Sequence, residues 1–371
     1  MLRVLFLLSS VLYAQSVEEW IRTAKQNDPE SQIKATDALV DHYVPGYMKS
    51  GLGGAISKAG TSVKGKFTDT NTQVVDAWVQ VRPDVIEAIG QVASGGSSYL
   101  ARANAARALG ILRAKAALPQ LGDALKSGDK VTQYEALIAI QKIRDIAAAP
   151  MVRPLLMSGD ERVQIAALET AGVLNDKSSV AEIRKALENS RNVKVRRTAV
   201  TALGMIADPA SRPVFELYFN DKDDNLRAAS AEGFGRMRQA SDLDRINKAF
   251  AEEKKTGPKM SQAFAAVLLG RRELGSGTPL SYLIEQLDSR FYGDTARPFL
   301  VEITRDQAIR QSIYNVVPTA NRKEKIGIAQ VLAVSGGKDS LPVVEQLSND
   351  PDTAVAAEGI KALRTLKSRL G

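Results

Sequence analysis

The chain of 371 residues contains no cysteine and a single histidine. Without cysteine, the chain has no disulfide, no thiolate metal site, no cysteine nucleophile and no lipid-modified cysteine anchor. The lone His42 excludes a histidine pair around a metal ion and leaves no second imidazole for a serine triad. We expect His42 near the end of a helix, where an imidazole satisfies the last carbonyl groups. The sequence therefore predicts no metal ion and no cofactor.

Long apolar runs are also scarce, and the one at residues 4–12 follows a short basic start. This layout is typical of a secretory signal peptide. The small residues Ala14 and Ser16 suit the two positions that a signal peptidase reads, so we expect cleavage after Ser16 rather than after Ala14. An uncleaved membrane anchor is the alternative, but it needs roughly 20 apolar residues. The sequence predicts an exported protein, either periplasmic or extracellular.

A sequence repeat is present instead, because residues 99–254 resemble themselves at a spacing of 31, once 32, residues. Three small or apolar columns are separated by four and three positions, which places them on one face of a first helix. The small-residue column lets a neighbouring helix approach closely. The columns are Ala105, Ala136, Ala167, Ala199 and Ser230; Leu109, Ile140, Ala171, Leu203 and Phe234; and Leu112, Ile143, Leu174, Ile206 and Met237.

A second helix follows the first in each repeat. Aspartates recur in the intervening turn, where a side chain can cap the next helix, and prolines recur in that helix's first turn, where a missing amide hydrogen costs nothing. The aspartates are Asp145, Asp176 and Asp208, and the prolines are Pro119, Pro150 and Pro213. The second helix has its own apolar columns. We therefore expect an all-α solenoid of about nine to eleven helix pairs.

The segments ARANAARALGIL, VKVRRTAVTALGMI and NLRAASAEGFGRM resemble the VRxxAxxALGxI pattern of HEAT repeats, especially the HEAT-like repeats of phycobilisome lyases. The resemblance covers roughly three quarters of the chain and implies an armadillo-like α-solenoid. It implies little about function, because such repeats bind many unrelated partners. Two enzyme classes use this fold, the bilin lyases and a group of DNA glycosylases. Their substrates are a phycobiliprotein and DNA, which an exported chain would not meet.

Residues 17–98 are less regular, so we divide the chain into a signal peptide at 1–16, irregular N-terminal helical units at 17–98 and a repeat array at 99–371. An insertion at 49–72 is rich in glycine and lysine and reads as a surface loop or a recognition segment. Its sequence from Gly60 to Lys66 has the glycine and lysine spacing of a phosphate-binding loop, but Phe67 stands where that motif needs a hydroxyl. The three loop lysines that we consider for binding are Lys58, Lys64 and Lys66.

Arginines on the first helices have a structural explanation, because in this repeat family they tie adjacent units together by ion pairs. They are Arg102, Arg107, Arg196, Arg197 and Arg227. The net charge of +8 consists of interspersed charges of both signs, which favours solubility and weak attraction to anionic surfaces.

From the repeat we predict a concave face lined by the second helices, and a non-catalytic scaffold that binds a protein or peptide there. A charge-driven binder of a membrane surface or of nucleic acid is the alternative, and a HEAT-based enzyme is a third reading. Nucleic acid is the weaker of the charge-driven partners because of the export signal. We expect a monomer. The predicted partner-binding residues are Arg153, Arg184, Lys185, Glu188, Glu216, Arg245 and Lys248.

Overall fold

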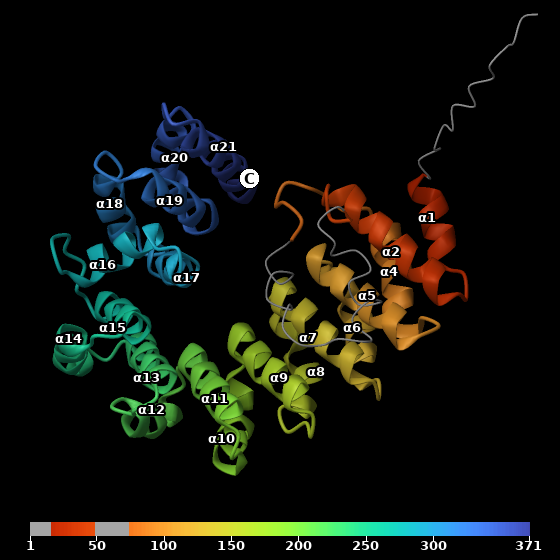
Figure 1. Cartoon of the computed structure of the whole chain (residues 1–371), viewed down its shortest axis with the longest axis horizontal. Coiled ribbons are helices and arrows are strands. Elements are labelled where there is room, and N and C mark those ends of the chain that lie inside the picture. Colours follow the sequence, from red (N-terminus) through yellow and green to blue (C-terminus); the bar gives the residue numbers. More distant parts are fainter. Residues whose placement is uncertain (1–15, 49–73) are drawn as a thin grey trace, which may run out of the picture. The chain divides into compact units, whose positions relative to one another are not determined.

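The computed structural model describes residues 16–48 and 74–371, which form twenty α-helices and their connecting turns (Figure 1). No strand occurs in these ranges, and the twenty helices confirm the predicted all-α solenoid of about nine to eleven helix pairs. Among the described helices, none combines the length and apolar character that a membrane span requires. The predicted signal peptide up to residue 15 and the insertion at 49–72, with Lys58, Lys64 and Lys66, lie outside the described residues.

The chain divides into two compact units, the first formed by residues up to 75 together with 81–143, and the second by 76–80 together with 144–371. In the first unit, α5 packs on α4 and α7, and α6 packs on α4 and α7. The predicted boundary at residue 98 stays a prediction. The helices of this unit are α1 (Val17–Ala24), α2 (Pro29–Tyr43), α4 (Pro83–Gly95), α5 (Tyr99–Ile111), α6 (Leu118–Lys126) and α7 (Lys130–Ile143).

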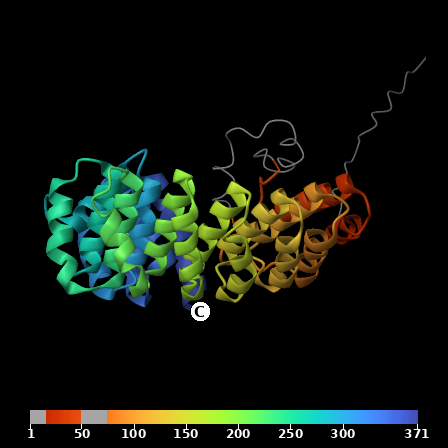
Figure 2. The ribbon, with the colours of Figure 1, turned by 90° about the horizontal axis from the view of Figure 1, so that it is seen from below.

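The second unit continues the alternation of first and second helices. Figure 2 shows its green to blue helices running roughly side by side. Its first helices are α9 (Glu161–Leu174), α11 (Val193–Ile206), α13 (Asp224–Met237), α15 (Thr256–Leu268), α17 (Gly293–Ile303), α19 (Arg322–Ser335) and α21 (Thr353–Leu370). Its second helices are α8 (Ala149–Val152), α10 (Val180–Asn189), α12 (Arg212–Tyr218), α14 (Leu243–Glu252), α16 (Pro279–Glu285), α18 (Gln307–Val316) and α20 (Leu341–Ser348).

The buried columns and caps of the repeat agree with the sequence pattern. The five residues of the small column, from Ala105 to Ser230, are completely buried. Asp145, Asp176 and Asp208 accept hydrogen bonds from backbone amides of the following turn. A proline occupies the first turn of α6, α8 and α12, as predicted. Local capping and burial along the array therefore follow directly from the spacing of residue types.

The two helix rows of the second unit differ in how closely they pack. Each first helix from α9 to α21 packs on the next first helix, whereas successive second helices make at most marginal contact and pack instead on first helices. Figure 1 shows the first helices on the inner side of the curve and the second helices on its outer side. The prediction that the second helices line the concave face is therefore wrong. The first helices line it.

The reason for this arrangement is the size of the residues between first helices. A Cβ added to Gly235 on α13 would lie 2.6 Å from the Cα of Ala265 on α15, which is closer than van der Waals contact allows. Gly110 on α5 has the same relation to Ala139 on α7 in the first unit, also at 2.6 Å. Glycine and alanine therefore bring the first helices together, and the row with the shorter spacing becomes the inside of the curve.

Candidate functional site

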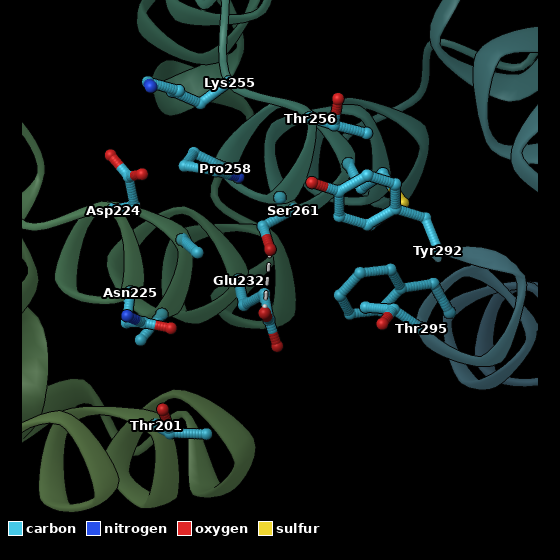
Figure 3. A pocket seen from close by; sticks show the side chains of 15 residues that line it. Thr201, Asp224, Asn225, Glu232, Lys255, Thr256, Pro258, Ser261, Tyr292 and Thr295 are labelled. Carbon is cyan, nitrogen blue, oxygen red and sulfur yellow. Dashed lines mark hydrogen bonds between the residues drawn. The ribbon is translucent and has the colours of Figure 1, made fainter. Parts of the chain in front are cut away.

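The concave face of the second unit carries a pocket of about 570 Å3, which four successive first helices line (Figure 3). Thr201 comes from α11, Asp224 and Asn225 from the start of α13, and Thr295 from α17. The start of α15 completes the wall, and Tyr292 precedes α17. Figure 3 shows Tyr292 and Thr295 on the opposite side of the pocket from Asp224 and Asn225. The residues that line the pocket therefore come from distant parts of the sequence, since the first is Thr201 and the last is Phe299.

An ion-pair network supports the wall of this pocket. The carboxylate of Glu232 accepts hydrogen bonds from the Ser261 hydroxyl at 2.9 Å and from Arg236 at 3.0 Å. Arg236 also donates to Glu302 on α17 at 2.9 Å and to the carbonyl of Gly204 on α11 at 3.3 Å. Its side chain therefore connects α11, α13 and α17, so the helices that line the pocket are tied to one another.

Arg236 also packs against an aromatic ring, with its guanidinium 4.7 Å from the ring centre of Phe264 on α15. Burial opposes the charge of this guanidinium, but the attraction of Glu232 and the hydrogen bonds to Glu302 outweigh burial and raise the pKa of Arg236. The guanidinium is therefore permanently charged, and the two carboxylates that it binds share its single positive charge. Glu232 is consequently a supporting residue of the pocket and not a free acid.

Several polar groups of the pocket have no hydrogen-bond partner among the described residues. In residues 16–48 and 74–371, no hydrogen bond engages the side chains of Thr201, Asn225 or Thr295, or the ammonium group of Lys255. Asp224 keeps one oxygen free, because only the other binds Arg227, at 2.9 Å. Hydroxyl, amide and charged groups that converge on one cavity can bind a polar segment by hydrogen bonds.

The pocket lining contains no histidine, and the described residues include no group of acidic or histidine side chains that could hold a metal ion. Its exposed charged side chains are Asp224, which also pairs with Arg227, and Lys255, and they lie on α13 and just before α15. The arrangement offers hydrogen-bond donors, acceptors and one charge of each sign. Binding is the chemistry that these groups support most directly.

The partner-binding residues predicted from the sequence all lie on the outer row. Arg153 forms an ion pair with Asp176 of the next repeat at 3.5 Å, and Arg184 reaches the carbonyl of Ala210 at 3.5 Å. Both arginines therefore contact the turn of the following repeat. Lys185 and Glu188 on α10 are exposed. Two of the seven predicted partner-binding residues are therefore contacts between repeats.

Three other predicted residues, Glu216, Arg245 and Lys248, do line one common cavity, of about 660 Å3, between α12 and α14 on the outer row. Arg245 lies over the rings of Phe219 and Phe234, at 5.9 and 5.0 Å from their centres. The structure thus brings these three side chains together, but on the convex side of the second unit and not on the concave side where we predicted them.

Three of the five predicted arginines of the first helices connect the repeats by ion pairs, whereas Arg102 donates to the carbonyl of Gly96 and Arg196 to the hydroxyl of Tyr218. Arg197 on α11 donates to Asp223, which caps α13, and Arg227 on α13 donates to Glu253 before α15 at 3.0 Å. In the first unit, Arg107 and Glu135 form a buried pair at 3.3 Å between α5 and α7. An arginine of one repeat thus binds an acid of the next along both units.

The comparison with known families agrees with this geometry, because the model of HEAT repeats matches residues 86–169 and 153–235. The chain contains HEAT repeats. The match begins inside α4 and includes the first helices α5, α7, α9 and α11. The HEAT repeats therefore span the division between the two compact units. The search of curated proteins finds no match.

Solved structures that resemble the HEAT solenoid include the complex of CpcE and CpcF of phycocyanin lyase from Nostoc, at 17% identity and a TM-score of 0.42, covering 76% of this chain and 98% of that one. An engineered protein matches at 17% identity and a TM-score of 0.43, covering 95% and 99%. Importin beta matches at 13% identity and a TM-score of 0.37, where the alignment covers 95% of this chain and 52% of that protein. These similarities concern the fold alone.

The pocket residues on the concave face were not predicted from the sequence. Thr201, Asn225 and Thr295 are polar residues at positions of the first helices that do not belong to the buried columns. The repeat pattern identifies these exposed positions, but the prediction places the second helices, and not the first, on the concave face. With the rows assigned correctly, the exposed polar positions of the first helices are the signal that finds this pocket.

Proposed function

We propose that this HEAT solenoid is a non-catalytic scaffold of the cell envelope or exterior that binds a protein or peptide in the concave pocket of its second unit. The observation that carries the proposal is the set of pocket side chains without intramolecular partners, Thr201, Asn225, Thr295 and Lys255. Polar side chains that already form hydrogen bonds within the protein gain little from binding a partner. Exposed polar groups that converge on a cavity can form hydrogen bonds with one.

The form of the pocket favours an elongated polar segment over a small apolar ligand. Four first helices contribute to its lining, so a bound segment would cross several repeats. The network around Arg236 fixes the spacing of these helices, and a preformed surface reduces the entropy lost on binding. Asp224 and Lys255 provide one charge of each sign for orienting the segment.

The location in the envelope rests on the predicted signal peptide, and the non-catalytic role rests on the chemistry of the pocket. Neither histidine nor cysteine lines the pocket, and of its two acids Glu232 binds Ser261 and Arg236 and Asp224 binds Arg227. A charge-driven binder of a membrane surface remains the alternative function. It predicts binding that depends on overall charge and not on particular pocket residues.

The experiment is capture of partners from native envelope extract with the full chain and with two variants. The variant Asn225→Arg with Thr295→Arg fills the pocket with long side chains, and Lys185→Glu changes an exposed charge of the outer row as a control. We expect a protein that the wild type and the control retain and that the pocket variant loses. Retention by all three forms would contradict the proposal. Retention that ignores the pocket variant but disappears at moderate salt would favour the charge-driven alternative.

A further inference from the structure

A second cavity, of about 170 Å3, lies at the carboxyl ends of the first helices α13, α15 and α17, apart from the concave pocket. Three arginines line it. Arg238 follows α13, Arg272 lies in the segment after α15, and Arg305 follows α17. Two acids, Glu302 and Asp306, are also in the lining, and buried aliphatic side chains complete it. The cavity shares no lining residue with the concave pocket.

Both acids of this cavity already form ion pairs within the protein. Glu302 binds Arg236 at 2.9 Å, and Asp306 binds Arg272 at 3.0 Å. Asp306 is also the cap of α18, where it accepts a hydrogen bond from the amide of Ala308 at 2.9 Å. In the part of the chain that the structure describes, neither Arg238 nor Arg305 forms an ion pair with a carboxylate. Arg238 and Arg305 therefore have no carboxylate partner, and the four arginines of this network, with Arg236 included, exceed its three acids by one positive charge.

The effect of one of these charges extends to a neighbouring arginine. Burial lowers the pKa of Arg369, and the positive charge of Arg305 lowers it further. The guanidinium of Arg369 donates to the backbone carbonyls of Ala333 and Gly336 and not to a carboxylate. The repulsion between two guanidinium groups is consistent with a lack of negative charge at this edge of the unit.

Arg272 provides an independent sign of a missing partner. Its Nε atom is buried, and within the described residues it has no hydrogen-bond acceptor. Buried donors in proteins nearly always have an acceptor, because an unsatisfied one costs about 1–3 kcal/mol. The partial negative charge at helix carboxyl ends favours arginines near them. This partial charge does not supply a hydrogen-bond acceptor for the Nε of Arg272, so a bound anion could supply one.

From these observations we propose that the cavity formed by Arg238, Arg272 and Arg305 binds an oxyanion, such as a phosphate group. Arg238 and Arg305 have guanidinium donors without a carboxylate partner, and guanidinium donors match the oxygens of phosphate in geometry. The cavity is large enough for one tetrahedral oxyanion. This site is independent of the concave pocket, so the scaffold proposal does not depend on it.

The test is isothermal titration of the full chain with inorganic phosphate, sulfate and acetate at constant ionic strength. Glycerol phosphate in a further titration distinguishes a free phosphate from a phosphate group carried on a larger molecule. We expect phosphate and sulfate to bind and acetate to bind at least tenfold more weakly. Tighter binding of glycerol phosphate would indicate that the substituent also contacts the protein, whereas equal binding would indicate recognition of the phosphate group alone.

Two variants identify the site. Arg238 has a left-handed backbone with φ of 52°, and Asn175 occupies the equivalent helix end with φ of 54°, so Arg238→Asn introduces a residue that this chain already tolerates there. We expect Arg238→Asn and Arg305→Ala each to weaken phosphate binding at least tenfold. The control Arg290→Ala removes an exposed arginine that does not line the cavity, and it should bind as the wild type does.

Circular dichroism of each variant confirms that it is folded before the titration. Equal phosphate affinity in the wild type, Arg238→Asn and Arg305→Ala would overturn the proposal, as would the absence of binding by the wild type at tens of millimolar phosphate. Either result would leave the partner capture by the concave pocket unaffected, so failure of this site and failure of the proposed function are distinguishable.

Discussion

Arg236 of α13 and Glu302 of α17 form an ion pair at 2.9 Å although a whole helix pair separates them in the sequence. The same guanidinium binds Glu232 and packs on the ring of Phe264, so one side chain spans three first helices. This bridge sets the geometry of the concave pocket, because the pocket lining comes from the helices that it connects.

We predict that Arg236→Met destabilises the protein by on the order of 3 kcal/mol, because it leaves two mostly buried carboxylates without their partner. The measurement is denaturant unfolding followed by circular dichroism. The matched control is Lys367→Met, which breaks an exposed pair with Glu345 and should change stability by less than about 1 kcal/mol. Equal effects of the two substitutions would show that Arg236 does not hold the helices together.

Close packing of the first helices gives a second prediction. Gly235→Ala would place a Cβ 2.6 Å from the Cα of Ala265, so α13 and α15 must move apart, at a cost of about 1–3 kcal/mol. Gly257→Ala on α15 is the control, because its Cβ meets nothing within 4 Å and alanine favours a helix. Thermal unfolding of both variants checks the pair. A Gly235→Ala protein as stable as the control variant would contradict the close approach.

Acid should weaken the contacts between repeats. Hydrogen bonds from Arg310 lower the pKa of Asp339 below its ordinary value of 3.8, burial opposes this effect, and Tyr314 adds a further hydrogen bond that lowers it. A carboxylate with a lowered pKa in the folded state stabilises the protein above the unfolded-state value. This contribution is lost as the pH falls through 3.8 and then through the lower pKa of the folded state.

The measurement is the free energy of unfolding between pH 6 and pH 2.5 for the wild type and for Asp339→Asn. The variant cannot titrate at this position, so we expect its stability to fall less steeply below about pH 4 than that of the wild type. Asp244→Asn is the control, since this exposed side chain has no ion pair in the described residues. Parallel curves for the wild type and Asp339→Asn would contradict the assignment.

Much of the fold was predictable from the sequence because it depends on local spacing. The columns that include Ala105 and Leu109, the aspartate caps and the prolines such as Pro119 all repeat at a fixed period, and each acts within one or two helices. Binary pattern and capping chemistry therefore predict the helix pairs and their order.

The curvature was not predictable from the period alone. A repeat shows that two rows of helices exist, but the inner row is the one with the shorter spacing between neighbours, which depends on contacts such as Gly235 with Ala265. The concave pocket also combines residues from several repeats, among them Thr201 and Thr295, that share no motif. Binding sites of this kind follow from the three-dimensional arrangement and not from sequence spacing.

Export is tested by the mass of the natural protein in an envelope or culture fraction. We predict a chain that begins at Val17. Ser16 caps α1 by accepting a hydrogen bond from the amide of Glu19 at 3.2 Å, so cleavage after Ser16 removes this cap and should let the first turn of α1 fray. A chain beginning at Gln15 would keep the cap and favour cleavage after Ala14. An intact Met1 in the cytoplasmic fraction would contradict export.

The most direct test of the concave-face scaffold is site-specific photo-crosslinking of the full chain in native extract. A photoreactive amino acid at Asn225 lies in the concave pocket, and one at Lys185 lies exposed on the outer row. The account predicts a discrete crosslinked protein from position 225 and none of that mass from position 185. Crosslinks from 185 alone, or the same products from both positions, would contradict it.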